Sequence, residues 1–385
     1  MPETHPETHN DRPGPSLAES AKPHTPAHSV LPLWALVVPF LGIGSYLAHL
    51  SYLGLAGVIG AAVIMMGCVL AAVHHAEVVA HRVGEPFGTL VLAIAVTIIE
   101  VSLIVSLMLS GSGDTATLAR DTVFAAIMII MNGIVGICLL VGGVRHHEQR
   151  FVLKGVSSAL CVLAAMASLS LVLPNFTSSV PGPFFSPSQL IFVAVVSLIL
   201  YGAFVLVQTV RHRDYFLPSG EGDLKPDAHA EPPTLKETLI AFGVLIVALA
   251  GVVLLAKSLS PHVEKAVVGA GLPLAVVGVL IAALVLAPES LSAIKAARRN
   301  RLQTSLNLAL GSALATIGLT IPAVAVLSVI MGWPLSLGLD TKSMVLLLLS
   351  FVVSIFSLGT GRTTVLQGVT HLVIFATYLF VTVVP

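Results

Sequence analysis

The sequence predicts an all-α polytopic membrane protein of about eleven transmembrane helices, arranged as one leading helix followed by two inverted five-helix repeats. Hydrophobic residues make up 56% of the 385 residues and charged residues only 10%. Soluble domains carry about 25% charged residues, so this composition excludes an ordinary soluble protein. Apolar runs long enough to span a bilayer recur along the chain. The formal net charge is zero, and therefore no basic surface for nucleic acid is expected.

Eleven apolar runs define the expected helices. They cover residues 33–50, 53–75, 87–110, 121–144, 152–173, 188–210, 237–256, 270–294, 303–331, 343–358 and 363–384. Residues 1–31 precede them and are rich in Pro, His, Thr and Glu, with no apolar core of a signal peptide. That composition predicts a disordered cytoplasmic tail.

A polar interruption at residues 211–236 divides the chain. Its Pro, Gly and charge content predicts a cytoplasmic linker between a first five-helix repeat at 53–210 and a second at 237–385. The run at 33–50 is then an extra leading helix. Because five is an odd number, the second repeat enters the membrane upside down relative to the first. Secondary transporters have this design, and their sites lie at the midplane where the repeats meet.

The distribution of Lys and Arg predicts the orientation. With the N-terminus in the cytoplasm, fifteen of the nineteen basic residues fall in cytoplasmic segments. The four on the other side are Arg120, Lys257, Lys265 and Lys342. This bias favours an odd number of spans, with the linker in the cytoplasm and the C-terminus periplasmic or extracellular.

One ionisable residue lies deep inside each of two apolar segments. Glu100 lies within residues 90–109 and Glu289 within residues 278–297. A charge at the bilayer centre costs roughly 2.5–3.5 kcal/mol on insertion scales, so such residues mark pathways, partners or relays. Two facing carboxylates cannot both stay ionised without a cation. We therefore expect them to form one cation and proton site; the alternative is that each is protonated and joins helices by hydrogen bonds.

Neighbouring residues supply further oxygen atoms. Thr97 lies one turn before Glu100 on the same helix face. Pro288 removes one hydrogen bond from the helix of Glu289, and the freed carbonyl oxygen of Leu284 needs a partner that lipid does not offer. Carboxylate, carbonyl and hydroxyl oxygens are the ligands of hard cations. Four more residues are expected to support the site: Asn132, Ser292, Ser312 and Thr316.

A His-x-Glu sequence precedes each buried glutamate. Glu77 follows His75, and Glu264 follows His262 at the corresponding place in the second repeat. We expect Glu77, His75, His81 and Glu264 to provide a gate or proton access, or else to cap helices at the interface. His74, His75, Glu77 and His81 also have spacings that suit a metal site. An intramembrane metalloenzyme is therefore one alternative function, and a passive cation channel is another.

Five stretches resemble the cation/proton exchangers of the calcium/cation antiporter superfamily, and most of all the bacterial Cha-type antiporters. They are HAEVVAHRVGEPFGTLVLAIAVTIIEVSLI (75–104), GGVRHHEQRF (142–151), YGAFVLVQTVRHRDYF (201–216), LAPESLSAIKAARRNRLQTSLNLALGSALATIGLTIPAV (286–324) and TGRTTVLQGVTHL (360–372). They occur in both halves and in the family's order.

The resemblance implies a secondary antiporter of a bacterial cytoplasmic (inner) membrane that exports Ca²⁺, or Na⁺ or K⁺, in exchange for protons. It implies one acidic ion-site residue per repeat, at Glu100 and Glu289, and an accessory glutamate at Glu77. The partners are inorganic cations, protons and lipid, with no cofactor; the oligomeric state is not implied. The wider family has a Gly-Asn pair before each glutamate. Here Val96-Thr97 and Val285-Leu286 replace it, which weakens the expectation of strict calcium selectivity.

Overall fold

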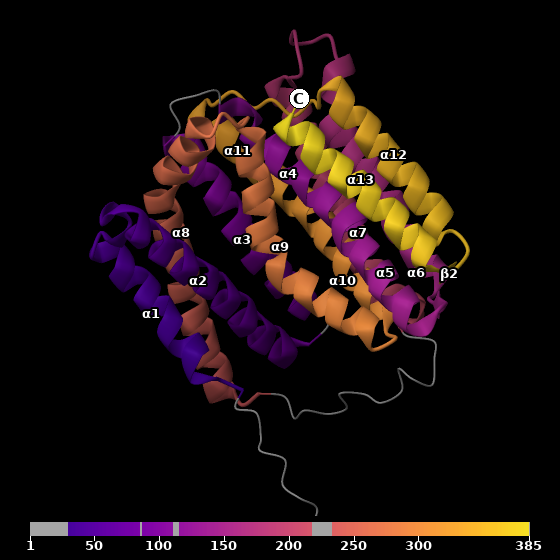
Figure 1. Ribbon diagram of the computed structural model, residues 1–385, viewed down its shortest axis with the longest axis horizontal. Helices are drawn as coiled ribbons and strands as arrows, with labels where there is room; N and C mark the ends of the chain where they lie inside the picture. Colours follow the sequence, from indigo (N-terminus) through magenta and orange to yellow (C-terminus); the bar gives the residue numbers. More distant parts are fainter. Residues whose placement is uncertain (1–29, 85–86, 111–114, 218–232, 385) are drawn as a thin grey trace, which may run out of the picture.

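A bundle of tilted helices makes up the protein (Figure 1). The computed structural model describes residues 30–84, 87–110, 115–217 and 233–384. The helices are α1 (Leu33–Leu47), α2 (Gly54–Val83), α3 (Phe87–Ser110), α4 (Leu118–Met128), α5 (Val135–His146), α6 (Leu153–Ala167), α7 (Pro187–Leu206), α8 (Leu235–Gly269), α9 (Ala275–Arg298), α10 (Leu302–Ala315), α11 (Ile321–Met331), α12 (Thr341–Leu358) and α13 (Val365–Val383). Strands β1 (Gln149–Arg150) and β2 (Arg362–Thr363) pair antiparallel.

The all-α membrane architecture is confirmed. Two of the spans are helix pairs joined by a π-helical turn: η3 (Ile129–Ile134) joins α4 to α5, and η9 (Thr316–Thr320) joins α10 to α11. Counted this way, ten spans within the described residues are long and apolar enough to cross a bilayer, and α1 is a shorter apolar helix of 15 residues. Residues 1–29 and 218–232, which hold most of the expected tail and linker, lie outside the described residues.

Several helix boundaries differ from those expected; α9, for example, covers Ala275–Arg298 rather than 270–294. The leading helix ends at Leu47 rather than at residue 50, because the chain turns at His49, which adopts a left-handed φ of 52°. Helix α2 runs to Val83 rather than 75, and α8 runs to Gly269 rather than 256. Hydropathy marks only the part of a helix that matches the membrane. At 1.5 Å per residue, these helices are about 45 and 52 Å long, well beyond the roughly 30 Å hydrocarbon core.

Helices α2 and α8 open the two halves and run in opposite directions. At one end, Arg82 Nη1 donates a hydrogen bond of 3.2 Å to the carbonyl of Pro233, just before α8. At the other end, the hydroxyls of Ser51 and Ser258 are hydrogen-bonded. The corresponding helices are therefore inverted, as the repeat hypothesis requires. The residue limits of the repeats, 53–210 and 237–385, remain a prediction.

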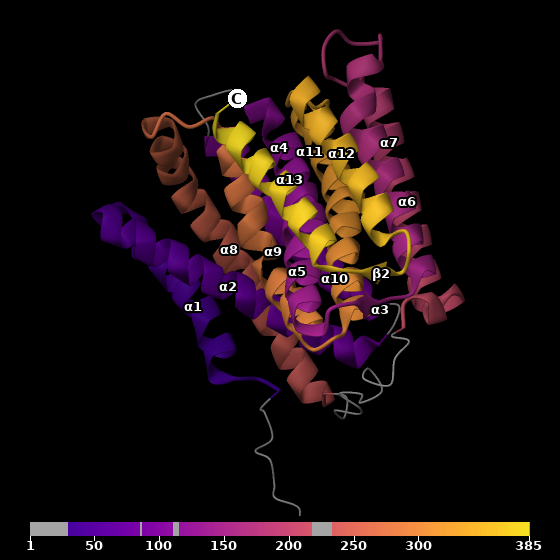
Figure 2. The same cartoon turned by 45° about the vertical axis from the view of Figure 1, so that its right-hand side comes forward.

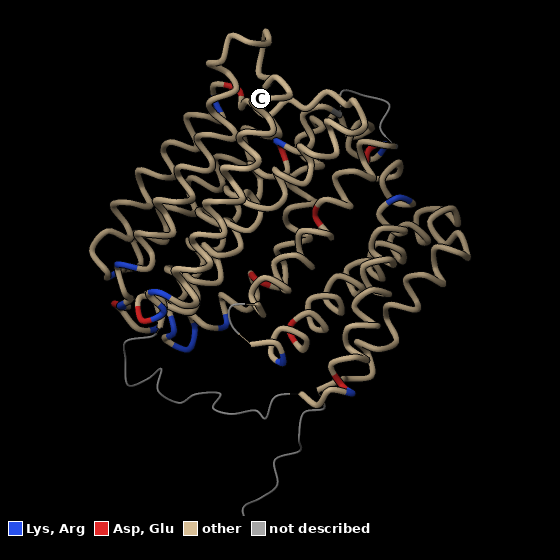
Figure 3. Tube along the Cα trace, turned by 180° about the vertical axis from the view of Figure 1, so that it is seen from behind, with Lys and Arg blue, Asp and Glu red and all other residues tan. Residues whose placement is uncertain are grey.

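The end of the bundle that holds Val83, Arg211 and Leu235, the helix termini nearest the linker, is called here the linker end. The opposite end is called the far end. Most Lys and Arg residues of the described part of the chain lie at the linker end (Figure 3). This is the distribution that the positive-inside rule associates with one side of a membrane.

The two glutamate-bearing helices are packed differently. Helix α3, which carries Glu100, packs along both α2 and α8, whereas α9, which carries Glu289, packs mainly along α4, α5 and α10. The π-helical turns cross between the halves: η9 packs on α3 and η3 packs on α9. Figure 2 shows α1, α2 and α8 on one side and the remaining helices on the other.

Glycines allow α13 to approach α5 closely. A Cβ atom on Gly368 would lie 2.5 Å from the backbone nitrogen of Leu140 and 2.9 Å from the carbonyl oxygen of Gly136. Because both obstacles are backbone atoms, no side-chain rotation relieves the overlap. Small residues have this role where membrane helices associate.

Substituting Gly368→Ala is therefore expected to destabilise the protein by about 1–3 kcal/mol, the usual cost of overpacking. A thermal unfolding curve of the detergent-purified protein measures this. Gly202→Ala on α7 is the matched control, because a Cβ atom at Gly202 would meet no described neighbouring atom within 4 Å. Equal midpoints for the two variants would contradict close α5–α13 packing.

Candidate functional site

Glu100 is buried inside the bundle and bonded to the opposite half. Its side chain is 2% exposed. Its Oε2 atom accepts a hydrogen bond of 2.8 Å from the Thr320 hydroxyl, and Thr316 contributes a second side-chain hydrogen bond. Both threonines belong to η9, whereas Glu100 belongs to α3. The carboxylate of the first half is thus held by hydroxyls of the second half.

The π-helical turn brings these hydroxyls into place. Such turns insert an extra residue into a helix and recur at functional sites. Gly318 lies between the two threonines, and a Cβ atom there would lie 2.6 Å from the Cβ of Tyr201 on α7. Only a glycine lets η9 lie this close to α7 while its other face meets α3.

Glu289 occupies the corresponding place in the second half but lacks an equivalent partner. Its Oε2 atom is buried and, among the described residues, has no hydrogen-bond partner. It lies within electrostatic range of Glu77 and Glu100. A buried polar atom without a partner is costly, and a bound ion or water is one explanation for it. The two halves of the site therefore differ in how their carboxylates are held.

A cavity of about 170 Å³, mostly apolar but with several polar side chains in its lining, adjoins Glu289. Its lining includes Ser312 of α10 and, nearer the linker end, Thr89, Gln208 and Asn307. These three residues lie close to the linker-end termini of α3, α7 and α10. The cavity therefore extends from Glu289 toward the linker end.

Of the expected supporting residues, Thr316 contacts Glu100 and Ser312 lines the cavity of Glu289. Thr97 donates to the carbonyl oxygen of Ala93 at 2.8 Å, within its own helix. Pro288 lies immediately before Glu289 within a continuous α9, and Ser292 is exposed one turn farther on. Thr97 and Ser292 are thus near the glutamates in sequence, but the hydroxyl of Thr97 is directed to its own backbone and Ser292 faces outward.

Asn132 belongs to a separate buried network. Its amide nitrogen donates to the Ser350 hydroxyl at 2.8 Å. Its Oδ1 atom lies 3.2 Å from Nδ1 of His371, whose Nε2 lies 2.8 Å from the Ser357 hydroxyl. This network joins η3 to α12 and α13. Asn132 therefore holds η3, the turn that packs on α9, in place, but its side chain bonds Ser350 and His371 rather than Glu289.

The expected gate residues lie at both ends. Glu77 is exposed on α2, toward the linker end, and is within electrostatic range of Glu289. His81 is exposed in the last turn of α2. Glu264 is half-buried toward the far end of α8. This opposite placement follows from the inversion of α2 and α8.

The histidines of α2 are held by backbone atoms of the chain's first helical region. His75 Nε2 lies 2.9 Å from the carbonyl oxygen of Ala35, and His74 Nε2 lies 3.1 Å from that of Val30. Among the described residues, no group of three or more His, Cys, Asp and Glu side chains is placed to hold a metal ion. The ring contacts give His74 and His75 a structural role and do not support the metalloenzyme alternative.

Sequence reasoning missed Thr320, the residue that bonds Glu100 most directly. It lies four residues after Thr316, a spacing that places two hydroxyls on one helix face. That spacing was the available signal. Gln208 and Asn307, which line the cavity, carried no comparable pattern, because they lie on different helices far apart in the chain.

Comparisons with known proteins identify the family. The Sodium/calcium exchanger protein family matches residues 53–210 and 240–384. The "Putative ionic transporter y4hA" of Sinorhizobium fredii is 49% identical over 359 residues, covering 92% of this chain and 97% of that protein. The "Sodium-potassium/proton antiporter ChaA" of Escherichia coli is 38% identical over 359 residues, covering 92% and 96%.

Two solved structures share the fold. YfkE superposes with a TM-score of 0.68 at 16% identity, covering 91% of this chain and 100% of that one. The H⁺/Ca²⁺ exchanger CAX superposes with a TM-score of 0.66 at 14% identity, covering 90% and 87%. The relatives are transporters rather than enzymes. The chain is therefore a multi-pass membrane protein that belongs to the sodium/calcium exchanger family, on its Cha-like cation/proton antiporter branch.

Proposed function

We propose that this exchanger exports Ca²⁺, or Na⁺ or K⁺, in exchange for protons, by alternating access around Glu100 and Glu289. The observation that carries the proposal is the pairing of two interior carboxylates from inverted halves. One is bonded to hydroxyls, and the other has an acceptor atom with no hydrogen-bond partner among the described residues. The names of ChaA and CAX support proton coupling, because both describe proton exchange. No cofactor has a part in this mechanism.

Coupling follows from competition for the same oxygen atoms. In a low-dielectric site, two nearby carboxylates need neutralisation by protons or by a cation. When the cation binds, the protons leave, and when protons return, the cation is released. The pair then titrates as a unit rather than as two separate groups. Exchange of the cation for protons therefore proceeds through binding and release alone, with no covalent intermediate on the protein.

Access to the site differs between the two ends. The cavity beside Glu289 extends toward the linker end, and its lining there includes the polar side chains of Thr89, Gln208 and Asn307. On the far side, a cavity of about 180 Å³ between α2, α3, α8 and α9 is lined almost entirely by apolar residues, including Leu107, Leu259 and Ile281. An apolar passage favours closure to hydrated ions. We infer that this conformation is open at the linker end and closed at the far end.

Movement of α2 and α8 relative to α9 supplies a route to the other state. These helices have little contact with α9 but pack closely on α3. Because the halves are inverted, an equivalent packing on α9 would close the linker end and open the far end. Glu77 on α2 would then move relative to Glu289, which suits its proposed role in ion or proton access.

The physiological orientation follows from charge. We propose that the linker end, the N-terminus and the gathered Lys and Arg residues face the cytoplasm of a bacterium, with the C-terminus on the periplasmic or extracellular side. The described conformation then loads its cation from the cytoplasm. That direction is the one that cation export requires.

A passive channel remains the rival function. It would need a continuous polar path, whereas the described conformation closes its far side with apolar residues. A steady current through proteoliposomes without a proton gradient would favour the channel. Cation movement that stops when the proton gradient is abolished, and that changes direction when the proton gradient is reversed, favours the exchanger.

Replacing either carboxylate is expected to abolish exchange. Glu100→Gln and Glu289→Gln each remove a titratable ligand, which costs about 3 kcal/mol or roughly 100-fold in cation binding. Dequenching of a pH dye in everted vesicles, with Ca²⁺, Na⁺ and K⁺ offered separately, measures the loss. Asp214→Asn is the control, because Asp214 is exposed at the linker end. Wild-type exchange in either glutamine variant would refute the proposal.

The Thr320 hydroxyl is expected to stabilise the ionised, cation-binding form of Glu100. A hydrogen bond to a charged group contributes about 1.5–3 kcal/mol, so Thr320→Val raises the cation KM about tenfold or more. Thr320→Ser keeps the donor and should retain activity. Thr377→Val, at an exposed position on α13, is the matched control. An unchanged KM in Thr320→Val would show that this bond does not serve binding.

A further inference from the structure

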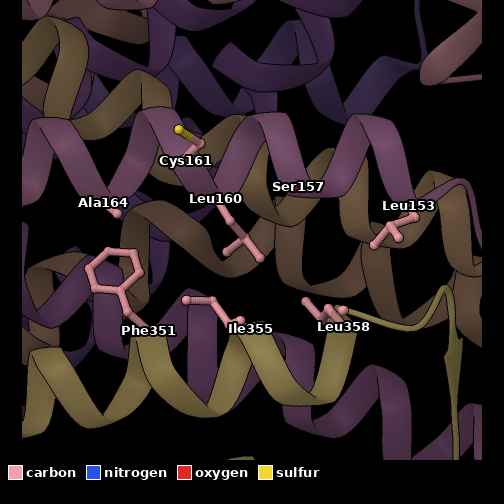
Figure 4. Close-up of a pocket in the computed structure, with 9 residues that line it drawn as sticks. Leu153, Ser157, Leu160, Cys161, Ala164, Phe351, Ile355 and Leu358 are labelled. Atoms are coloured by element: carbon pink, nitrogen blue, oxygen red, sulfur yellow. The ribbon is translucent and has the colours of Figure 1, made fainter.

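Helices α6 and α12 leave a groove between them at the surface of the bundle. Its volume is about 380 Å³, within the range of about 300–1,000 Å³ typical of small-molecule sites. Figure 4 shows Leu160 and Ala164 of α6 facing Phe351 and Ile355 of α12 across it. Most of the lining is apolar, and Ser157 contributes a hydroxyl. Such a groove on a membrane-spanning surface suits an acyl chain.

The length of the groove matches one leaflet of a bilayer. It runs along α6 from Leu153 to Ala164, which is about 16 Å at 1.5 Å per residue. The hydrocarbon core is about 30 Å thick, so the groove spans roughly half of it. One end lies at the start of α6 and the end of α12, at the linker end of the bundle. The other end stops inside the membrane region.

Two arginines lie beyond the linker-end mouth of this groove. Strands β1 and β2 place Arg150 directly opposite Arg362, and each arginine is only three residues from a residue that lines the groove. Figure 4 shows the strand that follows Leu358 at this same end. Like charges directly opposite each other destabilise a strand pair unless an anion lies between them.

One carboxylate serves both arginines. Glu148 Oε1 lies 3.6 Å from Arg150 Nε and 3.4 Å from Arg362 Nη1. The side chains of Arg150 and Arg362 are 71% and 57% exposed. Two arginines and one glutamate leave this group with a net positive charge, and the guanidinium is well shaped to bind a phosphate through two hydrogen bonds. Lys154, whose Nζ lies 4.9 Å from the centre of the Tyr215 ring, adds a further positive charge next to Leu153.

We propose that the α6–α12 groove binds one anionic phospholipid, with an acyl chain in the groove and the phosphate at Arg150 and Arg362. The single-leaflet length indicates a lipid rather than a protein helix, and the charge at the mouth selects an anionic headgroup. Basic sites between helices at the cytoplasmic side bind such lipids in other membrane proteins. The β1–β2 pair joins the loop before α6 to the loop before α13, so the lipid would hold segments of both halves.

Native mass spectrometry of the detergent-purified, full-length protein tests this. The protein is titrated with phosphatidylglycerol or with phosphatidylcholine of the same chain length. We expect one phosphatidylglycerol to be retained at concentrations at which phosphatidylcholine is lost. Equal retention of the two lipids, or of neither, would overturn the proposal.

Two sets of variants test separately the contribution of the lipid headgroup and that of its acyl chain to binding. Arg150→Gln with Arg362→Gln should lower phosphatidylglycerol retention about tenfold by removing the phosphate contacts. Ala164→Phe should lower retention of any lipid by filling the groove that Ala164 faces. Controls are Arg299→Gln, an exposed arginine at the same end, and Thr377→Phe, an exposed position on α13. If Ala164→Phe misfolds, the arginine variants decide. Unchanged phosphatidylglycerol retention in the arginine variants, or unchanged lipid retention in a folded Ala164→Phe variant, refutes the lipid assignment.

Discussion

The cost of placing a carboxylate inside a membrane is the constraint on which this protein depends. Lipid offers no partner, so the chain must supply hydroxyls, cavities or exchangeable ions to an interior glutamate. Glu100 meets this requirement through η9 of the opposite half. Glu289 meets it only partly: it adjoins a cavity lined in part by polar side chains, and its Oε2 atom has no hydrogen-bond partner among the described residues. Inversion of the halves is what makes such crossed contacts available.

The same constraint explains the difference between the halves. In the second half, η9 presents hydroxyls to α3. In the first half, η3 packs on α9 but commits Asn132 to Ser350 and His371. The two π-helical turns therefore have matching positions and different chemistry. The proposed exchange needs one site with two occupants rather than two identical sites, and we propose that the firmly held Glu100 and the unpartnered Oε2 atom of Glu289 serve that one site.

Much of this was predictable from the sequence. Apolar runs, the linker and the Lys and Arg distribution were sufficient for the all-α fold and for the inversion that α2 and α8 display. Hydropathy did not predict how far α2 and α8 extend, because it marks only the part of a helix that lies in the hydrocarbon core, and both helices continue beyond it. Glu100 and Glu289 were identifiable because each is isolated in an apolar segment. Thr320 was identifiable only through its four-residue spacing from Thr316. The cavity residues Gln208 and Asn307 were not identifiable, since only tertiary packing brings them near Glu289.

Proton release upon cation binding tests the central claim most directly. Purified protein in weakly buffered solution near neutral pH is mixed with Ca²⁺, Na⁺ or K⁺, and the pH change per bound cation is measured. Competition at Glu100 and Glu289 predicts that a transported cation displaces protons, and that the Glu100→Gln, Glu289→Gln double variant releases none. Cation binding of wild-type affinity without proton release would contradict an exchange site built from these two carboxylates.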